Sequence, residues 1–469
     1  MPNATAGAVT EPNYADIQGF ILRGYTHPFS VHMLFKFSTA GGASVFFKPL
    51  IPYLRSAEHW VTKPEMMLNI GLTWNGINIV RNDLQAVNFP GAFVDGPAAP
   101  NPQISLCDTG ASDPAKWWNK QFATGDIHCI VHAYALSDAD MSAMVKIIVD
   151  AAAATKGDVT ELFPMASGSK RIEQYPYLLN NTIHFGYRDS INEPALNPDP
   201  SPPNPTKEDL NNFLIGYNKQ SLPYPVTGAE GEFALNGCYN AFRVLFQDVP
   251  AFDKFLDDNA PAIATKTGKT VEYAREWLMA KLNGRWRNGS PLVVNPDMPD
   301  PETAELTKIS YAKDTNALRC PYAAHTRVVN PRDEAIAGGQ PPHLIRRGVP
   351  YGAPLNEHNK DEDRGLVGLF LCGSIPSQFQ KIYSWINSVD FSSLFPYPPP
   401  QDALVANRAL SGQTQVTSFS IPIPSASGIA GATGEIVIND LPQFVVTRGT
   451  AYFLLPGITT IKAIAGIKS

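Results

Sequence analysis

Short runs of apolar residues, separated by polar turns, predict a series of β-strands in the first half of the chain. These runs are rich in β-branched and aromatic residues, and strands are expected at residues 31–37, 68–73 and 128–135. From residue 137 to 154 the apolar positions instead recur at the spacing of one helix face, which predicts an amphipathic helix. A further helix is expected within 44–56. The pattern therefore predicts a mixed α and β arrangement.

The same succession of strands and helices returns in the second half. Strands are expected at residues 239–246, 320–329 and 364–372, and helices at 248–257 and 374–388. This weak duplication indicates an α+β fold of two ferredoxin-like modules, each an antiparallel sheet with flanking helices. The proline-rich stretch 197–205 is the expected linker. We therefore place the modules at residues 1–220 and 221–469.

Composition narrows the class of protein. Of the 469 residues 44% are hydrophobic and 17% charged, which is enough apolar material for a core and excludes disorder of the whole chain. The net charge of −6 lacks the basic character that phosphate contacts require, so no nucleic-acid partner is expected. No apolar run is long enough for a membrane span, and we expect no membrane partner.

The cysteines and the N-terminus bear on the cellular compartment. The five cysteines are scattered and form no CxxC or CxxCH motif, which argues against a disulfide framework, a zinc ribbon and covalently attached haem. The N-terminus has no basic segment followed by an apolar core, which is the pattern of a secretory signal. The protein is expected to be cytoplasmic, or extracellular if a signal has been removed by processing.

Candidate chemistry rests on single polar residues, because no HExxH, Walker or GxSxG motif occurs. Asp189 stands in a turn that contains glycine, where an aspartate is more often a turn or cap residue. His325 lies in an apolar stretch, where a histidine is usually a buried core residue but can also be a metal ligand. Arg346 belongs to an arginine pair, which is usually solvated but can also stabilise an anion.

Eight segments of the chain, taken in order, resemble the dye-decolorising peroxidases and in particular their longer fungal members. This family consists of haem peroxidases with two ferredoxin-like modules, of the dimeric α+β barrel type. The stretch 184–194 is similar to the family's GxxDG segment, and the others cover most of the remaining chain. The segments are residues 16–25, 184–194, 237–249, 284–292, 320–332, 344–352, 364–379 and 444–457.

The resemblance implies a haem peroxidase with iron in the C-terminal module. It assigns His325 as the proximal iron ligand, Asp189 as the distal acid and base that moves the peroxide proton, and Arg346 as the charge stabiliser. The expected cofactor is one non-covalent haem b per chain. The expected partners are hydrogen peroxide and bulky aromatic donors such as dyes and phenols, oxidised through an oxoferryl intermediate. An aspartate, with a pKa of about 3.9, implies an acidic activity optimum.

The resemblance also suggests further residues. Phe370 or its neighbour Leu369 would form the apolar distal wall, and Arg327 would bind a haem propionate. Dyes are too large for a narrow pocket, so electrons would leave from surface aromatics. Tyr351 and Trp385 fall where the family places such sites, although packing is the commoner role of an aromatic residue.

One departure leaves alternatives open. The motif's second glycine is replaced by Ser190, which could displace the Asp189 carboxylate if that position requires a positive φ. The main alternative is a haem-binding or haem-carrying protein with weak or lost peroxidase turnover. A haem-free scaffold in which His325 is structural is a third possibility. The sequence leaves monomer and homodimer open.

Overall fold

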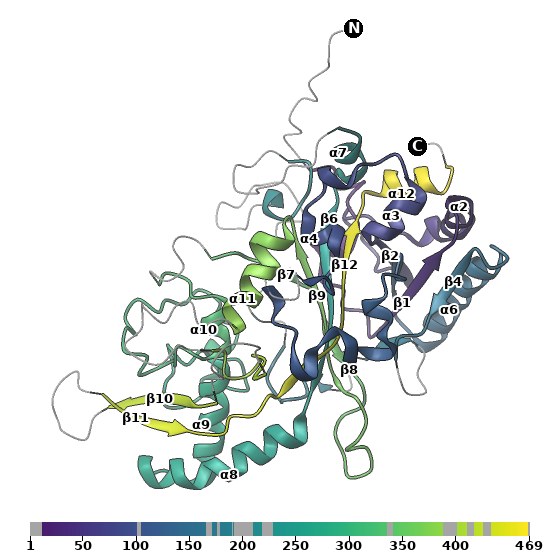
Figure 1. The fold of residues 1–469 in the computed structure, drawn as a ribbon. Coiled ribbons are helices and arrows are strands. Elements are labelled where there is room, and N and C mark those ends of the chain that lie inside the picture. Colours follow the sequence, from purple (N-terminus) through teal and green to yellow (C-terminus); the bar gives the residue numbers. More distant parts are fainter. Residues whose placement is uncertain are drawn as a thin grey trace.

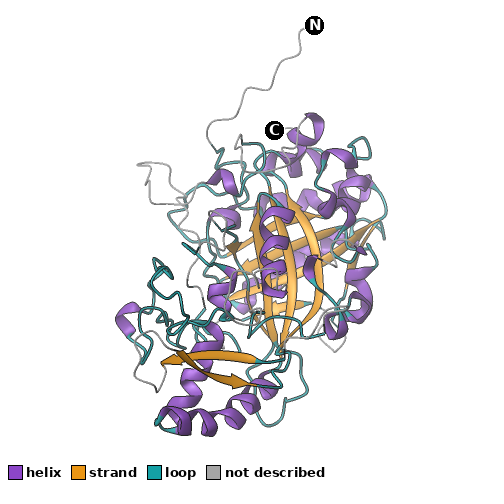
Figure 2. Ribbon diagram, turned by 60° about the vertical axis from the view of Figure 1, so that its left-hand side comes forward, coloured by secondary structure: helices purple, strands orange, loops and turns teal. Residues whose placement is uncertain are grey.

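The computed structural model shows a large antiparallel sheet with helices packed on both of its faces (Figures 1 and 2). Among the described residues, ten strands belong to this sheet, and a separate two-stranded hairpin lies beside it. None of the described helices is both long and apolar enough to cross a bilayer. The structure describes residues 12–100, 105–165, 171–175, 179–189, 191, 210–217, 228–334, 341–387, 401–409, 417–424 and 433–467.

The strands of the first half form one side of the sheet in the order β4-β1-β3-β2, with β5 also paired to β1. All of these pairs are antiparallel. The expected strands are therefore present, within one or two residues at each end. The bounds are β1 Phe29–Phe37, β2 Met66–Leu72, β3 Cys129–Ala135, β4 Val159–Leu162 and β5 Ile172–Gln174.

The strands of the second half continue the sheet in the order β12-β6-β9-β7, and β8 also pairs with β9. Counted in chain order within each half, with β7 and β8 as one interrupted strand, both halves read 4-1-3-2. This shared order confirms the expected pair of ferredoxin-like modules. The bounds are β6 Cys238–Gln247, β7 Ile345–Arg346, β8 Val349–Tyr351, β9 Gly365–Cys372 and β12 Val445–Leu455.

Several of the helices begin where the sequence supplies a capping side chain. Ser137 accepts a hydrogen bond from the Asp140 amide at the start of α6, and Asp248 does the same for the Ala251 amide in α8. The helices are α1 Gly19–Leu22, α2 Ala40–Phe47, α3 Trp74–Val80, α4 Gly91–Asp95, α6 Asp138–Ala153, α7 Gly228–Ala234, α8 Val249–Thr267, α9 Val271–Asn283, α10 His325–Val329, α11 Lys381–Asn387 and α12 Ile458–Ile464. A π-helical turn, Ile375–Gln380, leads into α11.

One predicted element is wrong, because residues 320–329 form a turn and the short helix α10 instead of a strand. The Asp314 carboxylate accepts hydrogen bonds from the Arg319 and Cys320 amides, and Pro321 follows, so the chain bends where the apolar run suggested extension. Helix α9 and the hairpin of β10 (Phe419–Pro424) and β11 (Thr433–Ile438) were not predicted. The linker 197–205 lies outside the described residues, and the boundary at 220 stays a prediction.

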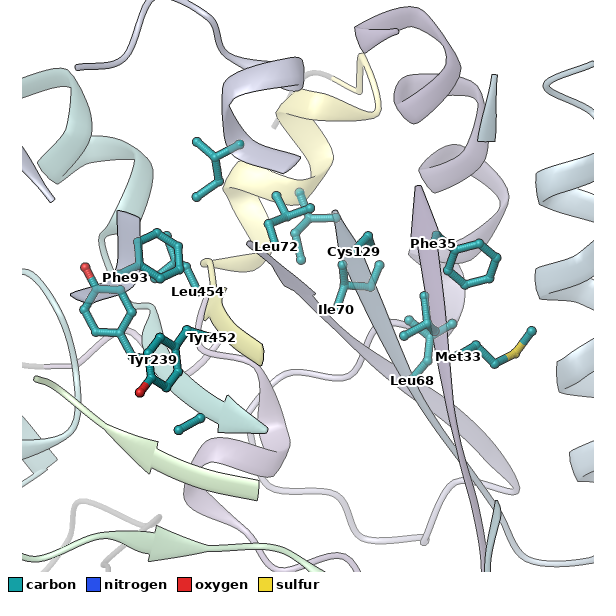
Figure 3. Packing of buried hydrophobic residues seen from close by; sticks show 14 of the residues in the cluster. Met33, Phe35, Leu68, Ile70, Leu72, Phe93, Cys129, Tyr239, Tyr452 and Leu454 are labelled. Atoms are coloured by element: carbon teal, nitrogen blue, oxygen red, sulfur yellow. The ribbon is translucent and has the colours of Figure 1, made fainter. Parts of the chain in front are cut away.

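The two halves share a core. Leu68 and Ile70 of β2 belong to the same buried cluster as Tyr452 of β12 and Tyr239 of β6 (Figure 3). Between β2 and β12 the ladder itself is short, and within the described residues it pairs Leu454 with Leu72 alone. Side-chain packing therefore contributes much of the contact that holds the halves together.

Candidate active site

A cavity of about 660 Å³ opens beside β9 in the second half of the sheet. This volume lies inside the range of roughly 300–1,000 Å³ that is typical of ligand and cofactor sites. The cavity lies between β9, the β7–β8 segment, α10, α11 and the segment of residues 183–189 with Ile191. Much of its wall is apolar, from Leu366, Phe370, Ile382, Ile386, Leu404 and Val445.

Strand β9 presents Phe370 to this cavity. Residues two apart on a strand share a face, and a β-carbon at Gly368 would overlap the Phe370 ring, so the glycine leaves room for the aromatic side chain. Phe370 packs against Phe379, with ring centroids 5.3 Å apart. Leu369 also borders the cavity, but it is 1% exposed and belongs to the core cluster on the other side of the strand.

His325, the first residue of α10, borders the same cavity. Its Nδ1 lies 2.7 Å from Oδ2 of Asp402, a carboxylate that is fully buried. The other oxygen of Asp402 accepts from the amides of Leu404 and Val405, both at 2.9 Å. Because Nδ1 donates to this fixed carboxylate, the neutral ring keeps its lone pair on Nε2, the nitrogen that can ligate a metal.

Asp402 was not identified from the sequence. It is separated from His325 by 77 positions, and it follows a proline-rich stretch that carries no helix or strand pattern. A buried carboxylate beside a histidine is a tertiary contact, so no local signal in the sequence could have indicated it. The identity of the group that accepts from the second ring nitrogen of His325 comes from the structure alone.

Asp189 lies on a loop from the first half of the chain, and this loop also borders the cavity. Its backbone amide donates to the Asn181 carbonyl at 2.9 Å, and Gly186 adopts a positive φ of 82° in the turn before it. Neighbouring Arg188 forms an ion pair with Glu305, so its charge is balanced there. Ser190 lies outside the described residues, and its effect on Asp189 stays a prediction.

Arg346 also borders the cavity and is held next to the Asp189 loop. Its Nη2 donates to the Ile191 carbonyl at 2.8 Å. A second bond joins the same two segments, from Nε2 of His184 to the Tyr351 carbonyl at 2.8 Å. Burial lowers the pKa of His184 to about 4, so its ring is neutral at higher pH. The loop and the β7–β8 segment are therefore tied together on both sides of the two charged residues.

Arg327 does not border the cavity, which corrects the expectation of a propionate partner at this position. It is 1% exposed, and its guanidinium bonds to Asp314 and Glu334 between the rings of Tyr311 and Tyr322. Two carboxylates already balance its charge. The cationic side chains that do border the cavity, apart from Arg188 and Arg346, are Arg285, Lys308, Arg332 and Arg347.

The expected surface position of Tyr351 and Trp385 is also wrong. They are 2% and 7% exposed, and neither borders the cavity. Tyr351 packs edge-on against Trp118 with ring centroids 5.5 Å apart, and burial raises its pKa well above the usual value. Both aromatic side chains therefore serve packing, and any role in electron transfer stays a prediction.

Comparison with known proteins gives a consistent set of relatives. No family model matches the chain. A dye-decolorizing peroxidase of Exidia glandulosa is 26% identical over 98% of this chain and 89% of its own length. Peroxidase 2 of Mycetinis scorodonius is also 26% identical, with the same coverage.

Solved structures agree with these sequences. An ancestral D-type dye-decolorizing peroxidase is 26% identical and superposes with a TM-score of 0.76 over 96% of this chain and 99% of its own. A dye-decolorizing peroxidase from Auricularia auricula-judae is 22% identical and has the same TM-score over 97% of this chain. The chain is therefore a homologue of the fungal dye-decolorizing peroxidases, with the fold of that oxidoreductase family.

Proposed function

We propose that the chain is a haem peroxidase that uses hydrogen peroxide to oxidise dyes, phenols or other bulky aromatic donors. One observation carries the proposal. His325, oriented by a buried carboxylate, borders the same cavity as Asp189 and Arg346. An imidazole lone pair, a carboxylate and a permanent cation in one apolar cavity are the groups that peroxide activation requires.

The residues present fit a single non-covalent haem b. Among the described residues, no group of three or more histidine, cysteine or acidic side chains could hold a metal ion, so a metal ligated by His325 would need other ligands. A porphyrin supplies four of them. The apolar wall that contains Phe370 suits its ring, and the cations near the cavity suit its carboxylates. With Arg327 committed elsewhere, Arg332 replaces it as our candidate for a carboxylate partner.

The side chains then divide the chemistry. Haem, when bound, supplies the redox-active iron. His325 would hold the iron through Nε2, while Asp402 accepts the Nδ1 proton and thereby makes the ligand more electron-rich. Asp189 would take a proton from one peroxide oxygen and return it to the other, which is the transfer that O–O cleavage needs. Arg346 offers a fixed positive charge to the oxygen that becomes negative.

Haem binding and peroxide reactivity test the proposal separately. Haem is titrated into the full chain, and the Soret band reports its binding. The loaded protein is then mixed with one equivalent of hydrogen peroxide at about pH 4, near the aspartate pKa. We expect a rapid fall of the Soret band. His325→Ala should abolish haem binding, whereas Asp189→Asn should retain haem and slow the reaction at least about a hundredfold.

The exposed carboxylate Asp258 on α8 provides a matched control, and Asp258→Asn should behave as the parent does. A parent that binds haem but leaves its Soret band unchanged with peroxide would contradict the peroxidase proposal. It would favour the alternative of a haem-binding or haem-carrying protein without efficient turnover.

A further inference from the structure

Two histidines that take no part in the proposed chemistry lie buried in the first half of the sheet. His32 of β1 and His132 of β3 are direct partners across the ladder. They are 1% and 0% exposed, and their Nδ1 atoms lie 2.8 Å apart. Two ring nitrogens at this distance share one hydrogen, because one must donate and the other must accept.

The neighbours of the pair decide which nitrogen donates. Gln174 of β5 donates its amide nitrogen to the Val349 carbonyl, which can only accept. Its side-chain oxygen therefore faces His32, and Nε2 of His32 must donate to that oxygen, 2.5 Å away. A neutral His32 then accepts at Nδ1, so the hydrogen between the rings belongs to Nδ1 of His132.

The hydrogen bond on the far side of His132 has the same order of donor and acceptor. With a hydrogen on Nδ1, His132 has its lone pair on Nε2, and the side-chain nitrogen of Asn240 lies 3.3 Å from that atom. Hydrogen bonds therefore point one way from Asn240 of β6 through both histidines and Gln174 to Val349 of β8. The series starts in the second half of the sheet, crosses the first half and returns to the second.

The end point connects this series to the cavity. Val349 borders the cavity and lies three residues after Arg346 in the β7–β8 segment, residues 345–351. Arg347 in the same segment donates to the Phe20 carbonyl at 2.9 Å, so the segment has a second tie to the first half. Hydrogen bonds to the first half thus hold the segment that carries the proposed distal arginine.

We propose that this one-way series of hydrogen bonds is a positioning device for Arg346, with Gln174 as the positioning residue. The inference rests on the proposed function, since it assigns a purpose to the placement of Arg346. Gln174 does not border the cavity and acts through the backbone of β8. In the neutral state each of the four hydrogen bonds of the series has one donor and one acceptor, which fixes one arrangement of the segment.

An added proton breaks this arrangement. A hydrogen on Nδ1 of His32 would face the hydrogen of His132. A hydrogen on Nε2 of His132 would require the Asn240 amide to turn over, so that its unpartnered oxygen accepts. Burial opposes the added charge, lowering the pKa of His32 to about 4 and that of His132 well below its usual value. The ionisable groups around the adjoining void of about 20 Å³ are Tyr25, His27, Tyr134 and Arg347.

Hydrogen–deuterium exchange of the full chain tests the device without relying on catalysis. In the parent at about pH 6, residues 344–352 should be protected. In Gln174→Met, which keeps the side-chain length but removes the amide, exchange there should be about tenfold faster. Lowering the parent to about pH 4 should also reduce protection after correction for intrinsic rates. The fall should be smaller in Gln174→Met, where only groups outside the series, such as His184 at the Tyr351 carbonyl, still take up a proton.

Gln443→Met is the matched control, because the Gln443 amide also donates to the carbonyl of a residue at the cavity, Val445, but it has no bond to the histidines. It should leave exchange at 344–352 unchanged. Unaltered protection in Gln174→Met, or an equal fall with acid in both proteins, would overturn the proposal. The loss of protection in acid is measured in the parent protein. It therefore tests the proposal even if Gln174→Met fails to fold.

A second readout ties the device to the site. Haem-loaded Gln174→Met should bind haem as the parent does and react with peroxide on the order of tenfold more slowly, because Arg346 is misplaced. A parent without any peroxide reaction would refute the proposed function and leave the exchange result standing. Loosened exchange together with an undiminished peroxide rate would show that the segment is held but that Arg346 does not depend on it.

Discussion

At the scale of single residues, the site depends on side chains whose remaining hydrogen-bonding capacity is already used. Asp402 accepts from His325 with one oxygen and from two backbone amides with the other. Such a carboxylate cannot rotate away, so it fixes both the orientation of the imidazole and the nitrogen that carries the hydrogen. The orientation of His325, the proposed iron ligand, is therefore set by Asp402, a residue that would not itself contact the iron.

Replacing this carboxylate should weaken haem binding. Asp402→Asn removes the negative charge and leaves only one oxygen to serve three donors, so His325 loses its fixed orientation. We expect a loss of about 10- to 100-fold in haem affinity, measured by Soret titration. Asp363→Asn, at a half-buried carboxylate that accepts from Trp118 outside the cavity, is the control. Equal affinities for the parent and Asp402→Asn would contradict this role.

Gly368 is a second residue whose identity follows from its surroundings. In Gly368→Ala the added methyl group overlaps the Phe370 ring, and overpacking of this kind costs about 1–3 kcal/mol. Urea unfolding should show this loss in the free energy of unfolding. Gly91→Ala is the matched control, since a β-carbon there meets no atom within 4 Å. A stable Gly368→Ala would mean that the ring moves aside at little cost.

At the scale of elements, the sheet is held together by buried polar pairs as well as by apolar packing. Arg243 of β6 forms a two-pronged ion pair with Asp108, and both side chains are at most 3% exposed. The same guanidinium bonds to Thr447 and Thr450 of β12 and lies 4.5 Å from the ring centre of Tyr383, which borders the cavity. One arginine thus joins two strands, a loop and the cavity wall.

Breaking this pair should be strongly destabilising. Asp108→Asn leaves the Arg243 charge buried without a carboxylate, and removing one partner of such a pair costs about 3–5 kcal/mol. The free energy of unfolding in urea measures the loss. Asp83→Asn, which breaks the exposed pair of Asp83 with Arg81, should change it by less than about 1 kcal/mol. Similar losses of unfolding free energy in the two variants would show that the buried pair stabilises the protein no more than the exposed pair.

At the scale of the whole molecule, several buried histidines are neutral in the folded state and bind a proton on unfolding. Burial lowers the pKa values of His32 and His184 to about 4, and that of His132 well below its usual value. Between the unfolded value of about 6.5 and these folded values, the unfolded chain holds more protons. Stability contributed by these histidines is therefore complete above the unfolded pKa and is lost as the pH falls.

We accordingly expect the free energy of unfolding to decline between about pH 6.5 and pH 4, by up to about 1.4 kcal/mol per pH unit for each histidine. Urea unfolding at several pH values measures the slope. His32→Phe combined with His132→Phe should reduce this slope, although it changes the core. A flat profile in the parent would show that the rings are not kept neutral. If stability does decline in acid, an acidic optimum of activity would lie in the pH range of reduced stability. A maximum of activity near neutral pH would contradict the expected role of Asp189.

Much of the local structure could be predicted from the order of the amino acids alone, and a family resemblance added candidate site residues. Strand and helix periods are properties of neighbouring residues, so β3, α6 and β9 could be located from the chain. The resemblance named His325, Asp189 and Arg346, which the fold then brought to one cavity. The strands and helices could be located because each depends on a short segment, whereas the roles of the three site residues stay predictions.

Contacts between residues that are far apart in the sequence could not be predicted and are known only from the structure. Asp402 joins His325 across 77 positions, and Gln174 reaches Val349 across 175. The folded chain also places Arg327 between two carboxylates and buries Trp385, against expectation. A side chain's partners depend on the packing of the whole sheet, and neither periodicity nor a motif encodes that packing locally. The fold therefore selects which charged and aromatic residues serve the site and which serve the core.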